Sequence, residues 1–294
     1  YIGGQWYWFD SLEGCAMATG RRVIDGHPYL LGAYGLVSGW CLDGDIWYYG
    51  QNGEVLTGWL FVGNKWYWLD PVNDGVMSKG IVCVGSSKYY LSESGAMAVG
   101  WAFDGNNWYY AEPSGALAYG WRFVNGAWYW LGSDGAMATG KLHLGGYDYY
   151  LKSSGAMAVG WAFDGLNWYY AEPSGALASG WRLIGGAWYW LDGANDHKMV
   201  TGFTAIGNNQ YHFSDSGALS LGWYLSDGGW YFSESLNASG IVKTGWLTVN
   251  CTYYYLDPVA GGKMSVGQFS VDGKDYFAKT SGALACREWV DVQD

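Results

Sequence analysis

WAFDGNNWYYAEPSGALAYG at 101–120 and WAFDGLNWYYAEPSGALASG at 161–180 agree at 18 of 20 positions. The copy between them, WRFVNGAWYWLGSDGAMATG at 121–140, agrees with the first at only 8 positions. The chain therefore repeats with a short period of about 20 residues and a long period of 60. Periods in this range are typical of solenoids and repeat arrays. The long period indicates that each unit turns by about a third of a circle relative to the unit before it.

One copy of the repeat has the pattern of a β-hairpin followed by a turn. Residues 101–104 are predicted to form a short strand and residues 107–111 an aromatic second strand. Gly105-Asn106 between them is typical of a tight hairpin turn, and Pro and Gly within 112–115 mark the next turn. Glycine recurs too often for a helix, and no 3.6-residue apolar stripe develops. The sequence therefore predicts an all-β fold made of hairpins.

A lone hairpin is only marginally stable in water, so each hairpin must bury its faces against neighbours. We expect a single elongated β-hairpin solenoid of about 14 repeats over residues 1–286, with about three repeats per superhelical turn. Residues 287–294 have the pattern of a truncated further unit or a tail. Because the chain opens inside a repeat, we expect it to be a fragment or a processed product of a longer protein.

Composition narrows the class of partner. The chain carries 21 Trp and 26 Tyr and has a net charge of −11. Nucleic acid is not expected as a partner, because a basic face should supply most of that affinity. An acidic surface instead favours a cationic ligand. No apolar run approaches the roughly 18–20 residues of a membrane helix, so no membrane span is expected.

The five cysteines occupy different places in the repeat and form no CxxC pair, which argues against a zinc site or a redox motif. We expect them to be free, small residues buried in the packing, with a bridge between Cys15 and Cys41 as the alternative. They are Cys15, Cys41, Cys83, Cys251 and Cys286.

The residue that opens the aromatic strand sorts the repeats into three classes. In the first class it is Trp47, Trp108, Trp168 and Trp230. In the second class it is Trp6, Trp66, Trp128, Trp188 and then Tyr253. In the third class it is Pro28, Lys88, Asp148, Gln210 and Asp275. A position that accepts Lys, Asp and Gln is a surface position, so its Trp in the other classes is an exposed large aromatic. This pattern predicts ligand sites on two of three faces.

The succession GW, about seven residues, WYY, GxM and GW again resembles the choline-binding or cell-wall-binding repeat, which is related to glucan-binding repeats and to the C-terminal repeats of clostridial toxins. The resemblance covers residues 1–286. It implies a left-handed superhelix of β-hairpins with threefold rotation, which agrees with the 60-residue period. It also implies a secreted or cell-surface, wall-associated bacterial protein, with self-association through an end hairpin as a further possibility.

In the choline-binding branch, the resemblance implies an aromatic cage between consecutive hairpins, made of two Trp of one hairpin, a Tyr of the next and often a Met. First-to-second junctions give Trp40, Trp47, Tyr67 and Met77; Trp101, Trp108, Tyr129 and Met137; Trp161, Trp168, Tyr189 and Met199; and Trp223, Trp230, Tyr254 and Met264. Second-to-third junctions give Trp59, Trp66, Tyr89 and Met97; Trp121, Trp128, Tyr149 and Met157; and Trp181, Trp188 and Tyr211, with Leu219 in place of Met. The set Trp246, Tyr253 and Tyr276 departs from the pattern, and third-to-first junctions lack both Trp, so no site is expected there.

A quaternary ammonium donates no hydrogen bond and is held by aromatic faces, at about 0.5–2 kcal/mol per contact. The main hypothesis is therefore a non-catalytic surface module that holds choline, or a similar cation, of a teichoic-acid-like polymer. Two alternatives stay open: a repeat region that binds glucans or host glycans, and a structural spacer or adhesin stalk whose Trp pairs serve packing alone. The partner is accordingly a choline-bearing or polysaccharide cell-wall polymer.

Enzymatic activity is not expected, and neither is a cofactor or a metal. The four histidines sit at scattered repeat positions, so no triad or metal constellation is apparent from the sequence. Glu112 and Glu172 recur in identical turns, which indicates copying of the repeat and not a catalytic pair.

Overall fold

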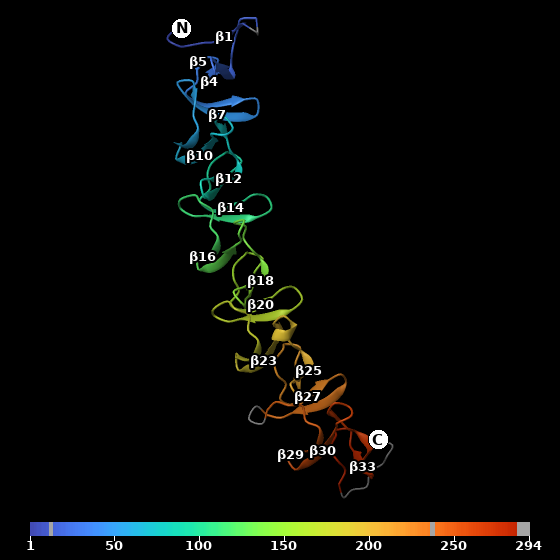
Figure 1. Ribbon diagram of the computed structural model, residues 1–294. Helices are drawn as coiled ribbons and strands as arrows, with labels where there is room; N and C mark the ends of the chain where they lie inside the picture. Colours follow the sequence, from blue (N-terminus) through green and yellow to red (C-terminus); the bar gives the residue numbers. More distant parts are fainter. Residues whose placement is uncertain (12–13, 236–238, 287–294) are drawn as a thin grey trace. The chain divides into compact units, whose positions relative to one another are not determined.

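The computed structural model describes residues 1–11, 14–235 and 239–286 (Figure 1). The chain divides into two compact units, each of which is described by itself. Unit 1 comprises residues 1–139 and 153–157, and unit 2 comprises residues 140–152 and those from 158 onward. The predicted further unit or tail at 287–294 lies outside the described residues.

Unit 1 is a succession of antiparallel hairpins, as the repeat predicts, and two of them are joined with short strands into one six-stranded sheet. The paired strands are β1 (Phe9–Asp10) with β2 (Ala16–Met17), β3 (Gly20–Ile24) with β4 (His27–Gly32), β6 (Gly39–Asp43) with β7 (Ile46–Gln51), β9 (Gly58–Val62) with β10 (Lys65–Asp70), β12 (Gly80–Val84) with β13 (Ser87–Leu91), β14 (Gly100–Phe103) with β15 (Trp108–Ala111), and β16 (Gly120–Val124) with β17 (Ala127–Leu131). Short strands follow some hairpins: β5 (Gly35–Leu36), β8 (Glu54–Val55) and β11 (Val76–Met77).

Unit 2 continues the same hairpin pattern. Its paired strands are β18 (Gly140–Leu144) with β19 (Tyr147–Leu151), β20 (Gly160–Phe163) with β21 (Trp168–Ala171), β22 (Gly180–Ile184) with β23 (Ala187–Asp192), β25 (Gly202–Ile206) with β26 (Asn209–Phe213), β27 (Gly222–Ser226) with β28 (Gly229–Ser233), β29 (Gly245–Val249) with β30 (Thr252–Asp257), and β32 (Gly267–Val271) with β33 (Lys274–Ala278). It also contains the short strands β24 (Lys198–Met199) and β31 (Lys263–Met264) and the 3-10 helix η2 (Gly193–Asn195).

The hairpin turns confirm the turn chemistry expected from the sequence. At Asn125-Gly126, between β16 and β17, both residues have positive φ, 49° and 84°. Two consecutive positive φ values define the type I′ turn, which matches the twist of the strands it joins. In the 101–120 repeat, the turn is closed by the Asp104 carboxylate, which accepts hydrogen bonds from the backbone amides of Asn106 and Asn107. These amides, that of Asn107 foremost, lower the pKa of Asp104.

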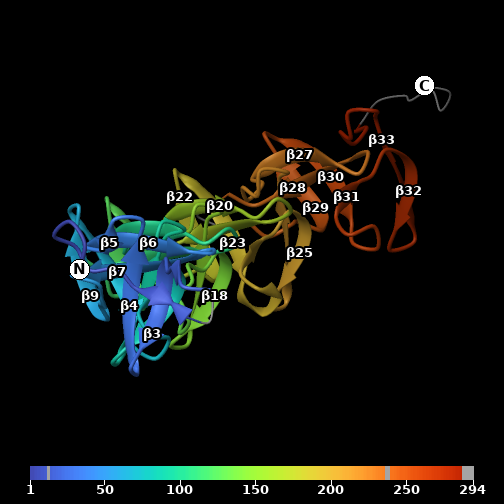
Figure 2. The ribbon, with the colours of Figure 1, turned by 90° about the horizontal axis from the view of Figure 1, so that it is seen from above.

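Consecutive hairpins are joined by a recurring backbone hydrogen bond. The amide of Met97 donates to the carbonyl of Trp66 at 2.8 Å, and the amide of Leu117 donates to the carbonyl of Lys88 at 2.8 Å. The bond uses main-chain atoms, so it forms in the same way behind Trp and behind Lys. In Figure 2, β3, β6 and β9 of unit 1, which begin three consecutive hairpins, point in different directions. The hairpins therefore turn from one repeat to the next, as the 60-residue period indicates, and the all-β hairpin solenoid is confirmed.

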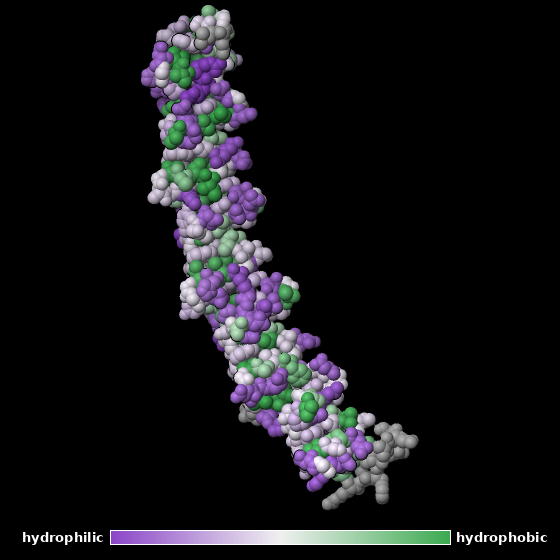
Figure 3. All heavy atoms as spheres, turned by 45° about the vertical axis from the view of Figure 1, so that its right-hand side comes forward, coloured by the Kyte–Doolittle hydropathy of each residue, from purple (hydrophilic) through white to green (hydrophobic). Residues whose placement is uncertain are grey.

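The core consists of small and branched side chains that lie at the ends of the aromatic strands. Leu69, Leu91 and Leu131 in unit 1 are fully buried at this position. Tyr109, Ala111 and Leu117 form a buried cluster against Tyr90. On the face drawn in Figure 3, hydrophobic side chains form small patches separated by hydrophilic ones. None of the helices in the described part of the chain has the length and apolar character needed to cross a lipid bilayer.

The cysteines correct one expectation. All five are free, but Cys15, Cys83, Cys251 and Cys286 are exposed and Cys41 is half-buried. The prediction of buried cysteines was therefore wrong. Cys83 shows the physical reason, because it lies on β12, where exposed residues alternate with half-buried ones along the strand. It occupies an outward position of that strand.

The glycines of the Ser-Gly turns at 94–95 and 114–115 are required by close packing. Gly95 has a φ of +79°, and a Cβ built there would lie 2.4 Å from Sδ of Met77 in the preceding repeat. Gly115 lies against Met97 in the same way, with 2.2 Å between the corresponding atoms. Any side chain at this position would displace the Met, and the repeat therefore retains glycine there.

We predict that Gly95→Ala destabilises the chain more than Gly100→Ala. Both glycines have a φ of +79°, but a Cβ at Gly100 meets no atom within 4 Å. Left-handed backbone costs a non-Gly residue about 1–2 kcal/mol in either variant. Gly95→Ala should cost roughly 1–3 kcal/mol more, because the new methyl overpacks Met77. Urea unfolding of the full chain measures the difference, and equal losses in the two variants would contradict the packing argument.

A second prediction concerns the buried His212 in unit 2. Its Nδ1 lies 2.8 Å from Ser220 Oγ, its Nε2 lies 3.1 Å from Ser226 Oγ, and its ring stacks on Tyr224 at 4.4 Å. Burial lowers the pKa of His212, against the opposing charges of Asp227 and Asp215. The neutral ring therefore stabilises the fold fully above the ordinary pKa of about 6.5, and this contribution is lost as the pH falls through the lowered value.

The slope from this one proton is at most about 1.4 kcal/mol per pH unit. His212→Phe should remove this slope from the free energy of unfolding as the pH falls below the ordinary His pKa of about 6.5. The replacement is tolerable because Phe232 stands at the equivalent position of the next repeat. His27→Phe serves as the control, since His27 is exposed. An unchanged acid slope in His212→Phe would contradict the assignment.

Candidate functional site

The residues predicted for the first cage surround one pocket. The cross-strand register pairs Trp40 with Tyr49 and Leu42 with Trp47. Trp40 and Trp47 are therefore diagonal neighbours on one face of the β6–β7 hairpin. Their ring centroids are 6.3 Å apart with an interplanar angle of 89°, so the indoles form two walls at a right angle.

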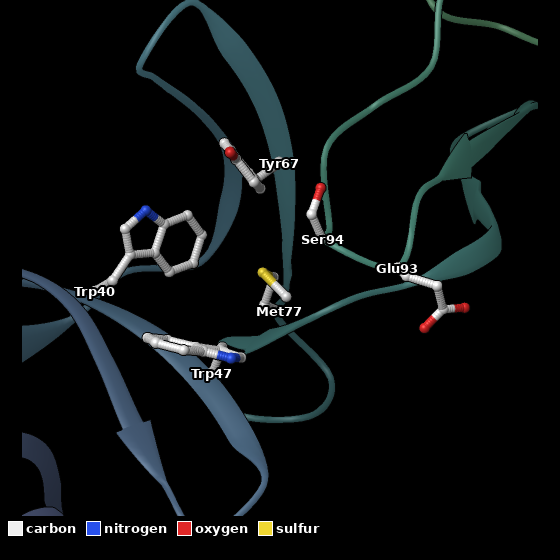
Figure 4. A pocket seen from close by; sticks show the side chains of 6 residues that line it. All are labelled: Trp40, Trp47, Tyr67, Met77, Glu93 and Ser94. Atoms are coloured by element: carbon white, nitrogen blue, oxygen red, sulfur yellow. The ribbon is translucent and has the colours of Figure 1, made fainter.

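The next hairpin supplies two more walls. The ring of Tyr67 on β10 lies 4.8 Å from that of Trp40, and Met77 on β11 lies at the base of the group (Figure 4). The pocket has a volume of about 210 Å³. A third hairpin also contributes, because Glu93 and Ser94 in the turn after β13 line the same pocket. Its walls are thus four apolar or aromatic side chains and a polar edge.

Three other predicted sets line pockets of the same design, with volumes of about 300 to 380 Å³. Their lining residues are Trp161, Trp168, Tyr189, Met199, Asp215 and Ser216; Trp181, Trp188, Tyr211, Leu219 and Ser239; and Trp59, Trp66, Tyr89, Met97, Val99, Pro113 and Ser114. In each pocket the tyrosine wall comes from the following hairpin, where it is the residue directly after the one that opens the aromatic strand: Tyr189, Tyr211 and Tyr89. The next residue along that strand does not line the pocket.

The remaining predicted sets are brought together to different extents. Trp101 lies 6.5 Å from Trp108 and 4.8 Å from Tyr129, and the amide of Met137 bonds to the carbonyl of Trp108. Trp223 lies 4.8 Å from Tyr254, with Trp230 on the paired strand β28 and Met264 on β31. Trp246 lies 4.9 Å from Tyr276, while Tyr253 takes the place of the second Trp.

Trp121 and Trp128 are 6.4 Å apart in unit 1, which also contains Met157, whereas Tyr149 belongs to unit 2. This cage stays a prediction. For all the sets, the role in ligand binding stays a prediction as well.

The second Trp is exposed in the pockets of Trp47, Trp66 and Trp168, as the class comparison predicts, and half-buried in that of Trp188. Trp47, Trp108 and Trp168 retain 39%, 45% and 45% of their accessible surface. One group that supports these rings was missed at the sequence level. Phe103 packs on Trp108 with centroids 5.1 Å apart, and Phe163 packs on Trp168 at 5.0 Å. The signal was available, because these Phe residues are the direct cross-strand partners of the Trp residues.

The third-to-first junction in unit 2 contains a cation of the chain itself. Lys141 stands where the other classes have their first Trp, and its Nζ lies 4.1 Å from the centroid of the Tyr169 ring. It also forms an ion pair with Asp196. Partial burial alone would lower the pKa of Lys141, but the hydrogen bonds to Asp196 and Tyr169 outweigh this effect and raise it. At this junction, where both Trp are absent, the chain thus places its own ammonium over a tyrosine ring.

Two recurring acids near the turns are paired within the chain. Glu112 accepts a hydrogen bond from Arg122 Nε at 2.7 Å, and Glu172 does the same from Arg182. The two glutamates therefore recur in the same structural ion pair between repeats. The histidines are less scattered than their positions indicated, because His143 and His197 both contact Asp148, at 2.7 and 3.0 Å.

The hydrogen bond from His143 is the main cause that lowers the pKa of Asp148. Sequence reasoning missed this cluster, since residues 148 and 197 are brought together only by the inserted turn after β23. Across residues 1–11, 14–235 and 239–286, no three His, Cys, Asp or Glu side chains are grouped so that they could hold a metal ion.

Two models of known repeat families match parts of the chain. The choline-binding repeat model matches residues 118–161. The putative cell wall binding repeat model matches residues 57–77, 99–117, 159–177, 179–194 and 201–219. A search of curated proteins finds no match.

Solved structures of three proteins from Streptococcus pneumoniae are similar to this chain. Choline binding protein F is 27% identical with a TM-score of 0.51, over 92% of this chain and 100% of that one. The modular autolysin LytC, in complex with a synthetic peptidoglycan ligand, is 26% identical with a TM-score of 0.52, over 85% of this chain and 53% of LytC. The choline-binding domain of CbpL is 30% identical with a TM-score of 0.45, over 66% of this chain and 100% of that domain.

The hairpin repeats, the matches to both repeat models and the similarity to choline binding protein F lead to one conclusion. The chain belongs to the choline-binding repeat family, whose members are also described as cell wall binding repeats.

Proposed function

We propose that this chain is a non-catalytic module that anchors its parent protein to the bacterial cell wall by holding choline, or a similar quaternary ammonium, in its aromatic pockets. The observation that carries the proposal is the pocket lined by Trp40, Trp47, Tyr67 and Met77 and repeated along the chain. A methylated ammonium has no hydrogen bond to donate and is attracted by the negative faces of aromatic rings.

Electrostatics and size support this ligand class. The net charge of −11 attracts cations to the surface. A volume of about 210 to 380 Å³ suits a small head group better than a drug-sized molecule. The Met thioether in the base is soft and polarisable and adapts to a methyl-covered cation. The polar groups that would read sugar hydroxyls are confined to one edge, as with Ser94 in the first pocket.

Repetition converts weak sites into firm attachment. One small cage of exposed aromatics should bind a single choline weakly. A polymer that bears many choline groups engages several pockets at once, which raises the overall affinity by roughly 10²–10⁴ over one site. A wall polymer of the teichoic-acid type is therefore the proposed partner, and the surface of a bacterium the proposed location.

Carbohydrate binding is a second candidate, favoured by one observation. The Phe103–Trp108 and Phe163–Trp168 pairs present half-exposed aromatic surface, on which sugar rings can stack. The modular autolysin LytC, a protein of similar fold, has been solved in complex with a synthetic peptidoglycan ligand. The role of a stalk or spacer would need no ligand at either place.

We predict that choline raises the melting temperature of the full chain and that glucose oligomers at the same concentration do not. A ligand at 100 times its Kd stabilises the folded state by about 2.7 kcal/mol per site. Thermal unfolding monitored with increasing choline, with isomalto-oligosaccharides as the parallel series, tests this. Stabilisation by the oligosaccharides alone would favour the carbohydrate function, and no shift with either would favour the spacer.

A second prediction identifies the pockets as the choline sites. Trp168→Ala should remove one binding site from the stoichiometry measured by isothermal titration calorimetry, because Trp168 forms one wall of its pocket. Leu166→Ala is the matched control: Leu166 lies on the turn of the same hairpin, is 83% exposed and lines no described pocket. The proposal is wrong about this pocket if both variants bind as many choline molecules as the parent chain.

A further inference from the structure

The polar edge of the pockets differs from repeat to repeat in charge. Glu93 lines the Trp40 pocket and Asp215 lines the Trp161 pocket. Each of these residues directly precedes a Ser-Gly pair in a turn. If the hairpin with the two Trp is counted as the first, this turn belongs to the third hairpin. In the other first-class sites the same position holds Ser153, beside the Trp101 set, and Thr280, beside the Trp223 set.

The packing of the turn glycine shows that these positions are equivalent in space. A Cβ at Gly95 would lie 2.4 Å from Sδ of Met77, and one at Gly217 would lie 2.2 Å from Sδ of Met199. The corresponding distance is 2.1 Å from Gly155 to Met137. Because the glycine is held against the pocket Met in each case, the residue two positions before it is brought to the same edge. We name this position the rim residue: Glu93, Asp215, Ser153 and Thr280.

We propose that the rim residue sets how strongly each first-class pocket prefers a cation over a neutral molecule of the same shape. The inference rests on the proposed function of these pockets. The aromatic walls are alike in the four sites and give each the same basal attraction for a methyl-covered ammonium. A carboxylate at the rim adds a charge interaction that only a cation experiences, so the pockets of Trp40 and Trp161 are the cation-selective members of the set.

The rim residue acts on a bound cation through solvent, and the strength of this interaction differs from pocket to pocket. The Glu93 side chain is 94% exposed, and Figure 4 shows it at the outer edge of the pocket, beyond Met77 and Ser94, with its carboxylate directed outward. Lys79 Nζ lies 3.9 Å from Glu93 Oε2 and partly offsets its charge. In the repeat of the Trp161 site, the position equivalent to Lys79 is occupied by the uncharged Thr201. Among the described residues, none forms an ion pair with Asp215. The expected order of cation preference is therefore Asp215, then Glu93, then the neutral rims.

A charge about 8 Å away in water changes the affinity for a monovalent cation by roughly two- to fourfold. Salt of about 0.5 M screens most of such an effect, because the Debye length then falls below that distance. An effect of this size at single pockets needs a measurement that resolves each site in the intact chain.

The full chain labelled with 5-fluorotryptophan provides this resolution by fluorine NMR. The Trp47 and Trp108 resonances report the pockets with Glu93 and with Ser153, and they are assigned with Trp47→Phe and Trp108→Phe. Each pocket is titrated with choline and with 3,3-dimethylbutan-1-ol, the neutral carbon analogue of choline. The variants Glu93→Ser and Ser153→Glu exchange the rim residues of the two pockets. Neither variant changes an aromatic wall.

At low salt we expect choline to bind the Trp47 pocket roughly two- to fourfold more tightly than the Trp108 pocket, and the neutral alcohol to bind both alike. Glu93→Ser should abolish the preference, Ser153→Glu should create it at the Trp108 pocket, and about 0.5 M salt should suppress both effects. The inference is overturned if the two pockets bind choline equally, or if the exchanges alter choline and alcohol binding by the same factor. If choline perturbs neither resonance, the proposed function fails as well, which separates the two failures.

Discussion

A single backbone hydrogen bond between consecutive hairpins underlies the arrangement of the pockets. It runs from the amide at the Met position of one repeat to the carbonyl at the exposed aromatic position of the repeat before, as from Met97 to Trp66 and from Met137 to Trp108. Since a lone hairpin is marginal in water, this link and the packing beside it supply what the hairpin lacks. The bond is indifferent to side chains, so Lys88 and Asp148 make it as well. The exposed position is thereby free to vary, and the chain can place indoles there without altering the fold.

The pocket follows from the same link. When the Met-position amide is bonded to the carbonyl of the second Trp, the Met side chain, the Tyr of its hairpin and the two indoles are brought to one point. The turn of a third hairpin then closes the edge, and it can approach only because glycine adds no side chain against the Met. Three consecutive repeats are therefore needed for one complete pocket. The pocket combines aromatic faces, a soft sulfur and a variable polar rim, a composition suited to a methylated cation.

The third class shows the same geometry without the two Trp. In unit 2, Lys141 lies over Tyr169 and pairs with Asp196, so the chain supplies its own cation at a junction that the other classes leave open. Phe203 lies 4.8 Å from Tyr231 at the following third-to-first junction, where it replaces the first Trp as a packing group. Sites and packing junctions thus share one scaffold and differ only in the side chains that occupy it. This division accounts for the sequence classes without any change in the hairpin itself.

The sequence by itself determined the hairpin repeat, its turns, the three classes and the residues of the aromatic walls, because all of these depend on local spacing that recurs many times. Gly105 and Asn125-Gly126 mark turns through φ preferences that need no tertiary context. Contacts between distant repeats were decided only by the tertiary structure. The rim residues Glu93 and Asp215, the Phe backing of Trp108 and the meeting of His143 and His197 at Asp148 belong to this group, as does the exposure of the cysteines. Each depends on how far one hairpin is turned and shifted against the next, and that displacement results from packing and backbone bonding between repeats, which the spacing within a repeat does not specify.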